Sequence, residues 1–380
     1  MVDALSSQSG GARTYMRAVL PRLAQRGARL TVVCRESQRR DFGLTAPQDG
    51  ITVEVAPERV APLSARLAYS STVVPLLCAR RHVDVLFCPT DHAPPWAPCA
   101  VTMMIRNPTP YVRGESTVAS TGRRIREAGM RTVTEASAWR SDRIILVSQA
   151  ALDATAAVIR LPTSRLRVIH HGRDARFHPP TPGHVRDEAL ILAVSSIYAF
   201  KNYPVLLEAL ALLHNVDGLH PRVLIAGAPF DREHAAFLHR HTEALGISKQ
   251  VSFLGEVPHA DLIDLYRRAT VFVMPSRLET FGHPYIEAMA TGTATVAADI
   301  PCAREMCGDA VQYFPPSSPA GLAEQLRQLL RDLHARAELE QRGPRQAERF
   351  SWDRCADETL AVFHEAANAH VTPGRALKAV

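Results

Sequence analysis

Two acidic side chains flank a short segment whose glycine and proline predict the beginning of a helix. Gly282 allows a tight turn and Pro284 suits a first helical position. The amide groups at such a helix start attract anions, and phosphate in particular. Glu279 precedes the turn, and Glu287 can lean back toward it because helical side chains tilt toward the N-terminus. The arrangement suits a ligand with hydroxyl groups on both sides of a phosphate, such as a nucleotide sugar.

Each carboxylate taken alone has a simpler interpretation. Glu287 in a first helical turn complements the helix dipole, and Glu279 could be a solvated loop acid. The combination of both with the glycine and proline spacing favours a binding site.

A lysine follows another apolar, strand-like run. Residues 191–194 lead into a loop that contains Lys201, and a helix with leucines at helical spacing is expected from Pro204. Lys201 at this place can neutralise a departing nucleotide diphosphate, whose charge grows in the transition state. The chain has only three lysines, so a chance surface lysine would be unusual, although a solvated loop residue is the alternative.

Short β-branched runs alternate with helical patterns, which is typical of βαβ units and parallel sheets. The expected strands of the first half are Leu30–Cys34, Ile51–Val55, Val83–Phe87, Ala100–Ile105, Arg143–Val147 and Arg167–Ile169. Those of the second half are Ile191–Val194, Val223–Ala226, Val251–Leu254, Val271–Met274, Thr295–Ala297 and Val311–Phe314. The sequence therefore predicts an α/β protein with two doubly wound domains.

A proline-rich break at residues 177–183 separates the two series and is interpreted as a linker. We expect an N-terminal, acceptor-binding domain over 1–180 and a C-terminal, donor-binding domain over 181–352. A helix within 353–380 should pack back toward the first domain. A ligand is expected where the carboxyl ends of the two sheets face each other.

Composition excludes several classes of protein. The 380 residues are 46% apolar and 22% charged, which is enough to bury two cores. No run of eighteen apolar residues occurs and the first ten residues do not resemble a signal peptide, so a cytoplasmic location is expected. Seven scattered cysteines without a CxxC pair favour reduced thiols over disulfides or a zinc site.

The net charge of +6 is carried almost wholly by arginine. Residues 112–140 are rich in arginine and helical in composition. They could touch anionic lipid at the inner membrane face or a lipid-diphosphate acceptor, although a solvated helix face is the favoured interpretation. Nucleic acid is not an expected partner.

The segment E-T-F-G-H-P-Y-I-E-A-M-A-T-G-T, residues 279–293, resembles the signature of retaining glycosyltransferase family 4 (glycosyl transferases group 1). Members of this family have the GT-B fold, in which two Rossmann-like domains face a central cleft. The resemblance implies that Glu279 binds hydroxyls of the donor sugar and Glu287 binds the ribose. It implies further donor contacts from Gly11, Ser196, Lys201, Val257, Thr280, Phe281 and Gly282.

Two departures from the family pattern concern the anion site. Ser196 stands where the family commonly has an arginine, which leaves Lys201 as the main positive charge. The glycine pair at Gly10 and Gly11 precedes the first helix, and the equivalent loop of the family lies across the cleft from the donor phosphate. Few residues remain before it for a first strand, so either the chain begins late or that edge of the sheet is short.

Candidate acceptor contacts follow two strands of the first half. His92 could contact the acceptor or move a proton, and a structural surface histidine is an equal alternative. Arg106 could bind an acidic or phosphorylated acceptor, and Asn107 could bind hydroxyls. Many family members have a His-Asp pair where this chain has Arg106-Asn107, which weakens any assignment of a catalytic base.

The resemblance implies a retaining hexosyl transfer from a nucleotide-diphosphate sugar, with GDP-mannose as the leading candidate, to a hydroxyl of a glycan, a lipid-linked sugar or a small metabolite. Lys201 and Glu279 are the candidate catalytic residues. No Asp-x-Asp motif occurs, so neither a metal nor a cofactor is expected. A sugar-nucleotide 2-epimerase and a non-catalytic nucleotide-sugar-binding relative stay open as alternatives.

Overall fold

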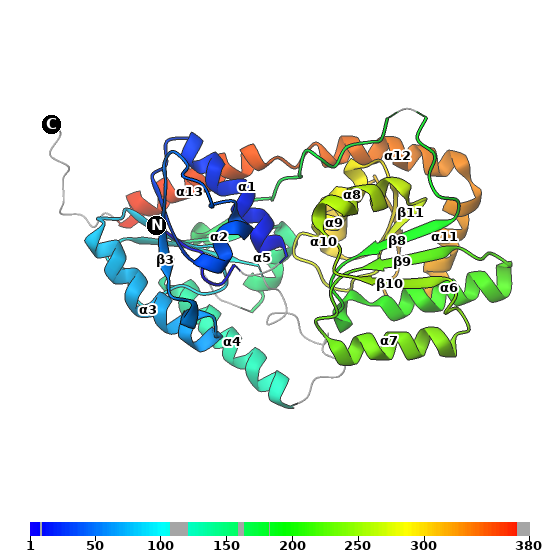
Figure 1. Cartoon of the computed structure of the whole chain (residues 1–380), viewed down its shortest axis with the longest axis horizontal. Coiled ribbons are helices and arrows are strands. Elements are labelled where there is room, and N and C mark those ends of the chain that lie inside the picture. Colours follow the sequence, from blue (N-terminus) through cyan, green and yellow to red (C-terminus); the bar gives the residue numbers. More distant parts are fainter. Residues whose placement is uncertain (8–9, 107–120, 159–162, 182, 371–380) are drawn as a thin grey trace. The chain divides into compact units, whose positions relative to one another are not determined.

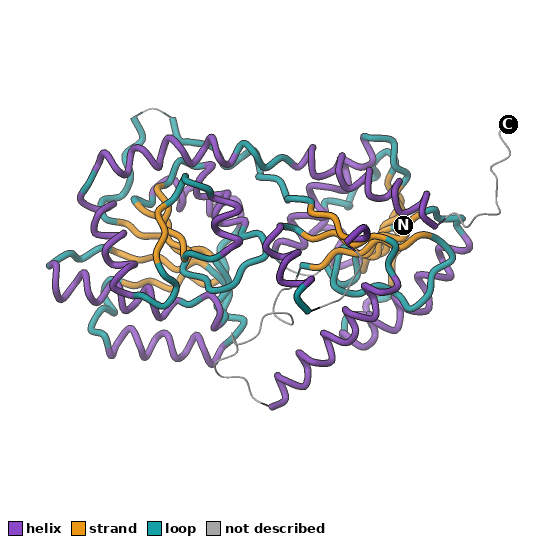
Figure 2. The backbone as a smooth tube through the Cα atoms, turned by 180° about the vertical axis from the view of Figure 1, so that it is seen from behind, coloured by secondary structure: helices purple, strands orange, loops and turns teal. Residues whose placement is uncertain are grey.

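Parallel strands form two separate sheets in the computed structural model, one in each of two structural units (Figure 1). The structure describes residues 1–380 except 8–9, 107–120, 159–162, 182 and 371–380, and only the backbone of 121–127. Unit 1 contains the described parts of residues 1–172 together with 351–370, and unit 2 contains those of 173–350. Figure 2 shows the strands of each sheet between layers of helices.

Unit 1 has a seven-stranded parallel sheet in the order β3-β2-β1-β4-β5-β6-β7. Its strands are β1 Val2–Asp3, β2 Leu30–Arg35, β3 Ile51–Ala56, β4 Val85–Cys88, β5 Ala100–Ile105, β6 Arg143–Leu146 and β7 Leu166–Val168. Its helices are α1 Gly11–Gln25, α2 Glu36–Phe42, α3 Leu63–Arg80, α4 Thr121–Arg140, α5 Gln149–Ala156 and α13 Trp352–His370. Helix α1 packs against α2 and α13, and α3 and α4 lie across the sheet from them (Figure 1).

Unit 2 has a six-stranded parallel sheet in the order β10-β9-β8-β11-β12-β13. Its strands are β8 Leu190–Val194, β9 Arg222–Ala226, β10 Val251–Gly255, β11 Val271–Met274, β12 Ala294–Ala298 and β13 Gln312–Phe314. Its helices are α6 Tyr203–Asp217, α7 Arg232–Ala244, α8 His259–Arg268, α9 His283–Ala290, α10 Pro301–Cys307, α11 Pro319–Arg331 and α12 Leu333–Ala347. Helix α6 packs with α7 and α11, whereas α9 packs with α8, α10 and α12.

The central strands explain why the sequence predicted this fold. Every residue of β8, β11 and β12 is buried. Strands covered by helices on both faces are apolar along their whole length, which produces continuous runs such as Val-Phe-Val-Met. Each of the twelve predicted strands is present, with its ends within two residues of the expected ones. The predicted α/β class with two doubly wound domains is confirmed.

The first strand differs from expectation. β1 is short, but it is not at an edge of the sheet, because Val2 pairs with Val32 of β2 and with Phe87 of β4. The interpretation of a short sheet edge is therefore wrong. Val2 is almost fully buried between its two neighbouring strands.

The chain passes between the units at Gly172 and again at Phe350, whereas the sequence predicted boundaries at residues 180 and 352. The prolines after Phe177 look like a linker, but Phe177 itself is fully buried. Its ring packs against His259 and Tyr266 of α8, at centroid distances of 5.0 and 5.8 Å. The proline-rich segment is thus held by unit 2.

Helix α13 returns to unit 1, where it packs on α1 and on strands β4, β5 and β6. The ring of Trp352 at its first position stacks on His171, with 5.4 Å between centroids. All seven cysteines are buried and none forms a disulfide, as the sequence predicted. Among the residues that the structure describes, no helix combines the length and the apolar character needed to cross a membrane.

Candidate functional site

The strand order of unit 2 reverses between β8 and β11. From β8 the chain moves outward through β9 to β10, then returns to β11 on the other side of β8. In open α/β sheets, ligands bind outside the carboxyl ends of the strands at such a switch point. The loops that leave β8 and β11 carry Lys201 and Glu279 respectively.

These two loops bring Lys201 and Glu279 into contact. The ammonium nitrogen of Lys201 donates to Oε1 of Glu279 at 2.6 Å. The two side chains are only 13% and 10% exposed. A nearly buried pair of opposite charges at a switch point is an arrangement that the sequence did not predict, because it depends on how the two loops are fixed together.

Backbone and side-chain contacts of the neighbouring residues fix the loops. Asn202 has a left-handed backbone with φ of 58°, which asparagine tolerates better than most residues. Its side-chain amide donates to the carbonyls of Pro275, at 3.0 Å, and Pro316, at 2.8 Å. The amide of Arg277 donates to the carbonyl of Phe200 at 2.9 Å. The position of Lys201 is therefore tied to the loop that carries Glu279.

Gly282 gives this loop its turn into α9. Its φ is 73°, and a Cβ atom there would stand 2.5 Å from a ring carbon of Tyr285, which is fully buried. Any larger residue would meet both backbone strain and a steric clash. The helix begins at His283, one residue before the predicted Pro284, and its positive end follows directly on the loop of Glu279.

Glu287 lies in α9 and is held by α8. The imidazole Nε2 of His259 donates to its Oε1 at 2.9 Å, and the hydroxyl of Tyr266 donates to its Oε2 at 3.0 Å. The hydrogen bond to Glu287 raises the pKa of His259, and burial raises the pKa of Tyr266 well above its usual value. Tyr266 therefore always has a proton to donate. The two glutamates have separate protein partners: Glu279 pairs with Lys201 of the loop after β8, and Glu287 with His259 and Tyr266 of α8.

The remaining donor-side candidates follow strands of the same sheet. Ser196 is half-buried in the loop after β8, and Val257 is half-buried between β10 and α8. Thr280 precedes Phe281, which is buried and packs edge-on against Phe350 at 5.6 Å. Because all strands of the sheet are parallel, these residues share its carboxyl edge.

Unit 1 has its own switch point between β1 and β4. Gly11 is the first residue of α1, which follows β1, and His92 follows β4. Burial lowers the pKa of His92 to about 4. His92 is therefore neutral near neutral pH, where it can accept a hydrogen bond but is a weak base.

Arg106 follows β5 and is tied to the loop that carries His92. Its amide donates to the carboxylate of Asp91 at 2.7 Å. Its guanidinium carbon lies 5.5 Å from the centre of the buried Tyr15 ring, and burial lowers its pKa. Asn107, the other predicted acceptor contact, lies outside the described residues.

Helix α4 covers part of the arginine-rich segment. Of the arginines whose side chains are described, Arg131 pairs with Glu135 at 2.8 Å, and Arg140 donates to the carbonyl of Pro95. Both are therefore engaged within unit 1. The contact of this segment with a membrane stays a prediction.

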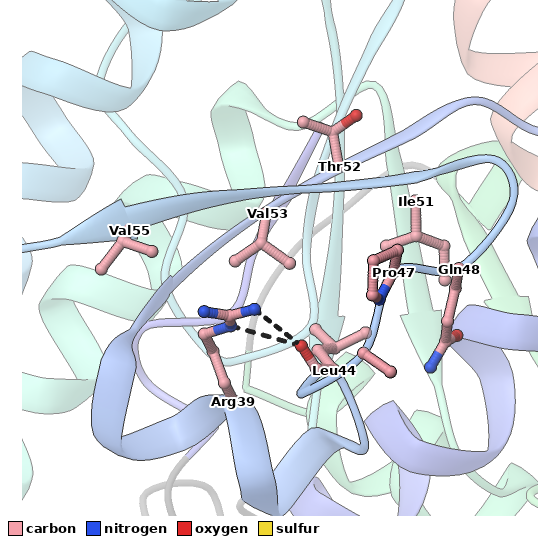
Figure 3. A pocket seen from close by; sticks show the side chains of 9 residues that line it. Arg39, Leu44, Pro47, Gln48, Ile51, Thr52, Val53 and Val55 are labelled. Atoms are coloured by element: carbon pink, nitrogen blue, oxygen red, sulfur yellow. Dashed lines mark hydrogen bonds between the residues drawn. The ribbon is translucent and has the colours of Figure 1, made fainter.

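A pocket of about 330 Å³ lies elsewhere in unit 1, between α2 and β3 (Figure 3). Its nine lining residues include none of the predicted site residues. Arg39, which points toward it, donates to the carbonyl of Leu44 from Nε at 3.3 Å and from a terminal nitrogen at 3.2 Å. This arginine is part of the local structure.

Across the described part of the chain, no group of three or more histidine, cysteine, aspartate or glutamate side chains could hold a metal ion. The expectation that the reaction needs no metal stays a prediction.

Three residues of the site were missed by sequence reasoning. Asn202 follows Lys201 directly, and an asparagine before a tyrosine-proline helix start could have indicated a left-handed turn. His259 and Tyr266 are seven residues apart, which places them on one face of a helix two turns apart. That spacing was visible, but nothing in the sequence indicated that this face meets Glu287.

Two Rossmann-like sheets, with charged loops at the switch point of the second, define the architecture of a GT-B glycosyltransferase. Family models match both halves of the chain: Glycosyltransferase Family 4 over residues 9–177, and Glycosyl transferases group 1 over residues 174–346. The two matches meet near the boundary of the units. The chain belongs to glycosyltransferase family 4.

Curated relatives agree with this assignment. A D-inositol 3-phosphate glycosyltransferase of Corynebacterium urealyticum is 34% identical over 45% of this chain, and the match spans 41% of the length of that relative. One of Salinispora tropica is 26% identical over 97% of this chain and 83% of its own length. O-antigen chain mannosyltransferase B of Escherichia coli is 35% identical over 30% of each chain.

Solved structures show the same fold. A sucrose-phosphate synthase of Thermosynechococcus elongatus matches with a TM-score of 0.78 at 16% identity, over 97% of this chain and 98% of its own. Anabaena HepE in complex with UDP-glucose matches with a TM-score of 0.72 at 18% identity, over 95% of this chain and 98% of its own. At these identities the likeness concerns the fold.

Proposed function

We propose that this chain is a retaining glycosyltransferase that moves a hexosyl group from a nucleotide-diphosphate sugar to a hydroxyl acceptor. The observation that carries the proposal is the ion pair between Lys201 and Glu279, at the switch point of unit 2 and beside the start of α9. A cation, a carboxylate and a positive helix end meet there. A sugar diphosphate has phosphates for the cation and the helix end, and sugar hydroxyls for the carboxylate.

In the proposed complex, Glu279 accepts hydrogen bonds from hydroxyls of the donor sugar, and Lys201 faces the diphosphate together with the amides at the start of α9. Glu287 accepts hydrogen bonds from the ribose. Without donor, Lys201 and Glu279 neutralise each other. The donor brings an anion for the lysine and hydroxyl groups for the carboxylate, so both stay compensated when it binds.

The proposed mechanism is attack from the face of the sugar that the leaving group departs from. The acceptor oxygen bonds to the anomeric carbon while the bond from that carbon to the diphosphate oxygen breaks. The acceptor proton passes to the leaving phosphate oxygen, and the anomeric configuration is retained. Lys201 and α9 stabilise the negative charge that develops on the diphosphate.

GDP-mannose is the first donor to test, in line with the similarity to the Escherichia coli mannosyltransferase. UDP-glucose is the second, because Anabaena HepE of the same fold was solved with that ligand. On the acceptor side, we propose that Arg106 and the neutral His92 contact the acceptor. The relatives named D-inositol 3-phosphate glycosyltransferase make a phosphorylated polyol a first acceptor to try.

A donor screen followed by kinetics of Lys201→Ala tests the proposal. Stabilisation of the folded protein by GDP-, UDP- or ADP-sugars identifies the donor, because a ligand that binds the native state raises the melting temperature. With that donor, Lys201→Ala should lower kcat by about 10²-fold or more, since it removes a charge aimed at the leaving group. Lys249→Ala, at an exposed position before β10, is the matched control.

Near-normal turnover by Lys201→Ala would defeat the proposed role of the lysine. Interconversion of donor epimers without transfer would instead identify a 2-epimerase. Tight binding without transfer or slow hydrolysis of any donor would identify a non-catalytic relative.

The absence of a metal requirement is a separate part of the proposal. With Lys201 and α9 supplying the positive charge, dialysis against EDTA should leave the rate of transfer unchanged. Loss of activity that returns on adding Mg²⁺ or Mn²⁺ would overturn it. As a control, Mg²⁺ or Mn²⁺ is added in the same assay to enzyme that has not been dialysed against EDTA.

A further inference from the structure

We propose that His259 is a positioning residue of the donor site, which holds Glu287 in the orientation that receives the ribose hydroxyls and adds a protonatable charge beside the bound nucleotide. The inference rests on the proposed function and concerns a residue that the signature segment of residues 279–293 does not contain.

Helix α8 presents two donors to one carboxylate. His259 is the first residue of α8 and Tyr266 lies two turns later on the same face. His259 donates to Oε1 of Glu287 and Tyr266 to Oε2, so each carboxylate oxygen has one protein partner. The carboxylate plane is thereby fixed, and each oxygen keeps acceptor capacity for a ligand hydroxyl.

The three residues of this clamp, His259, Tyr266 and Glu287, differ in how far they are buried. The side chain of Glu287 is 11% exposed, and Tyr266 is fully buried. His259 is the more exposed partner, at 36% of its side chain, so it is the member of the clamp that solvent protons reach. Phe177 packs against one side of its ring at 5.0 Å.

The other ring nitrogen of His259 faces two charges of the segment before β8. Nδ1 lies 3.4 Å from a terminal nitrogen of Arg176 and 3.9 Å from a carboxylate oxygen of Asp174, which is itself paired with Arg176 at 2.6 Å. In the neutral ring, Nδ1 accepts from Arg176 while Nε2 donates to Glu287. In the protonated ring, Nδ1 turns from acceptor to donor and faces Asp174.

The charges around His259 therefore favour its protonated form. Glu287 and Asp174 are negative, Arg176 is positive and Tyr266 stays neutral. The hydrogen bond and charge of Glu287 raise the pKa of His259, with a further contribution from Asp174, against the opposing effects of burial and Arg176. The histidine donates to Glu287 in both forms. Only the protonated form adds a positive charge near an anionic nucleotide.

The contribution of His259 to nucleotide affinity depends on pH. Protonation strengthens the clamp and attracts the diphosphate, so nucleotide affinity gained from His259 is present at low pH and is lost as the pH rises through its raised pKa. His259→Gln keeps an amide donor for Glu287 but cannot be charged. This variant separates the positioning role from the charge.

Calorimetric titration of the full chain with UDP, GDP and ADP, and then with the 2′,3′-dideoxy form of the tightest binder, tests the inference. At pH 8, His259→Ala should weaken binding of the ribonucleoside diphosphate by about 5- to 20-fold and that of the dideoxy form by less than twofold. His259→Gln should restore binding to within about twofold at pH 8. His334→Gln, whose side chain is 86% exposed on α12, is the matched control.

Between pH 8 and pH 5.5 the affinity of the wild type should rise more than that of His259→Gln. The comparison cancels the titration of the nucleotide phosphates, which is common to both proteins. Equal losses for ribose and dideoxy ligands in His259→Ala at pH 8, or parallel pH profiles for wild type and His259→Gln, would overturn the inference while leaving the donor site in place. Failure of the wild type to bind any of the three diphosphates would instead reject the proposed function, and the inference with it.

Discussion

The charges of Lys201 and Glu279 compensate each other in a nearly buried setting. Neither side chain can be removed without leaving an uncompensated charge behind, which is costly where water is scarce. The same two groups are the proposed contacts of the donor. Replacing one of the two residues therefore changes stability and catalysis at once. Replacing both residues together leaves no unpaired charge, so the effect on folding can then be separated from the effect on catalysis.

A double-mutant cycle measures this separation. Lys201→Met and Glu279→Gln should each lower the free energy of unfolding by roughly 1–3 kcal/mol, because each leaves one charge without its partner. The double variant should recover a large part of that loss in urea denaturation while staying inactive. Additive losses of stability would show that the pair does not act as a unit in the folded protein.

The element that makes the donor loop possible is the turn at Gly282. Two separate effects forbid a side chain there: a positive φ and the nearby ring of Tyr285. Gly246 has a similar φ of 70° and no atom within 4 Å of its potential Cβ. The two glycines thus allow the steric effect to be measured apart from the backbone effect.

Gly246→Ala should cost only the backbone strain, about 1 kcal/mol of unfolding free energy. Gly282→Ala should cost roughly 1–3 kcal/mol more, because Tyr285 must move, and should also weaken donor binding. Thermal and urea unfolding of both variants checks the prediction. Equal losses for the two variants would mean that Tyr285 adapts without cost.

A Tyr285→Leu change offers a further check at the same element. A smaller side chain at residue 285 removes the clash, so the double variant with Gly282→Ala should be less destabilised than the sum of the single variants. The loss of unfolding free energy in the double variant, measured relative to Tyr285→Leu alone, then reports the backbone strain at residue 282.

Sequence patterns identified elements far better than contacts. Buried parallel strands such as β11 and β12 are continuous apolar runs, which single out their positions. β1 has two residues, too few for any periodic pattern, so its central place could not be predicted. The prolines after Phe177 predict a linker because they break secondary structure, whereas the burial of Phe177 against α8 is decided by packing.

The same limit applies to the site. The sequence placed Lys201, Glu279 and Glu287 at strand and helix ends, because glycine and proline mark those ends. It could not show that Lys201 meets Glu279, since that contact depends on the hydrogen bonds of Asn202 between distant loops. Nor could it show that His259 contacts Glu287, because that contact depends on how α8 packs against α9.

At the scale of the whole chain, the two units differ in how they are assembled from the sequence. The sheet and helices of unit 2 come from one continuous stretch, residues 173–350, whereas unit 1 needs α13 from the far end of the chain. Helix α13 covers β4, β5 and β6 and stacks Trp352 on His171. Without it, apolar surface of these strands would face water.

This difference predicts opposite behaviour of two fragments. Residues 173–350 alone should fold cooperatively and bind the same nucleotide as the full chain, as seen by circular dichroism and calorimetry. Residues 1–172 alone should aggregate or stay partly unfolded, because β4–β6 lack their cover. A soluble, cooperatively unfolding 1–172 fragment would contradict the importance of α13.

The tie between the β8 and β11 loops sets a rule for engineering. The side-chain amide of Asn202 donates to the carbonyl of Pro275, and the carbonyl of Phe200 accepts from the amide of Arg277. The two loops are therefore structurally coupled, although some seventy residues of chain separate them. Transplanting one segment from another transferase would bring in a lysine or a glutamate whose counterpart stands in the wrong place. Chimeras that aim at a new sugar should exchange both segments at once, and libraries that diversify only one of them would consist mostly of mismatched halves.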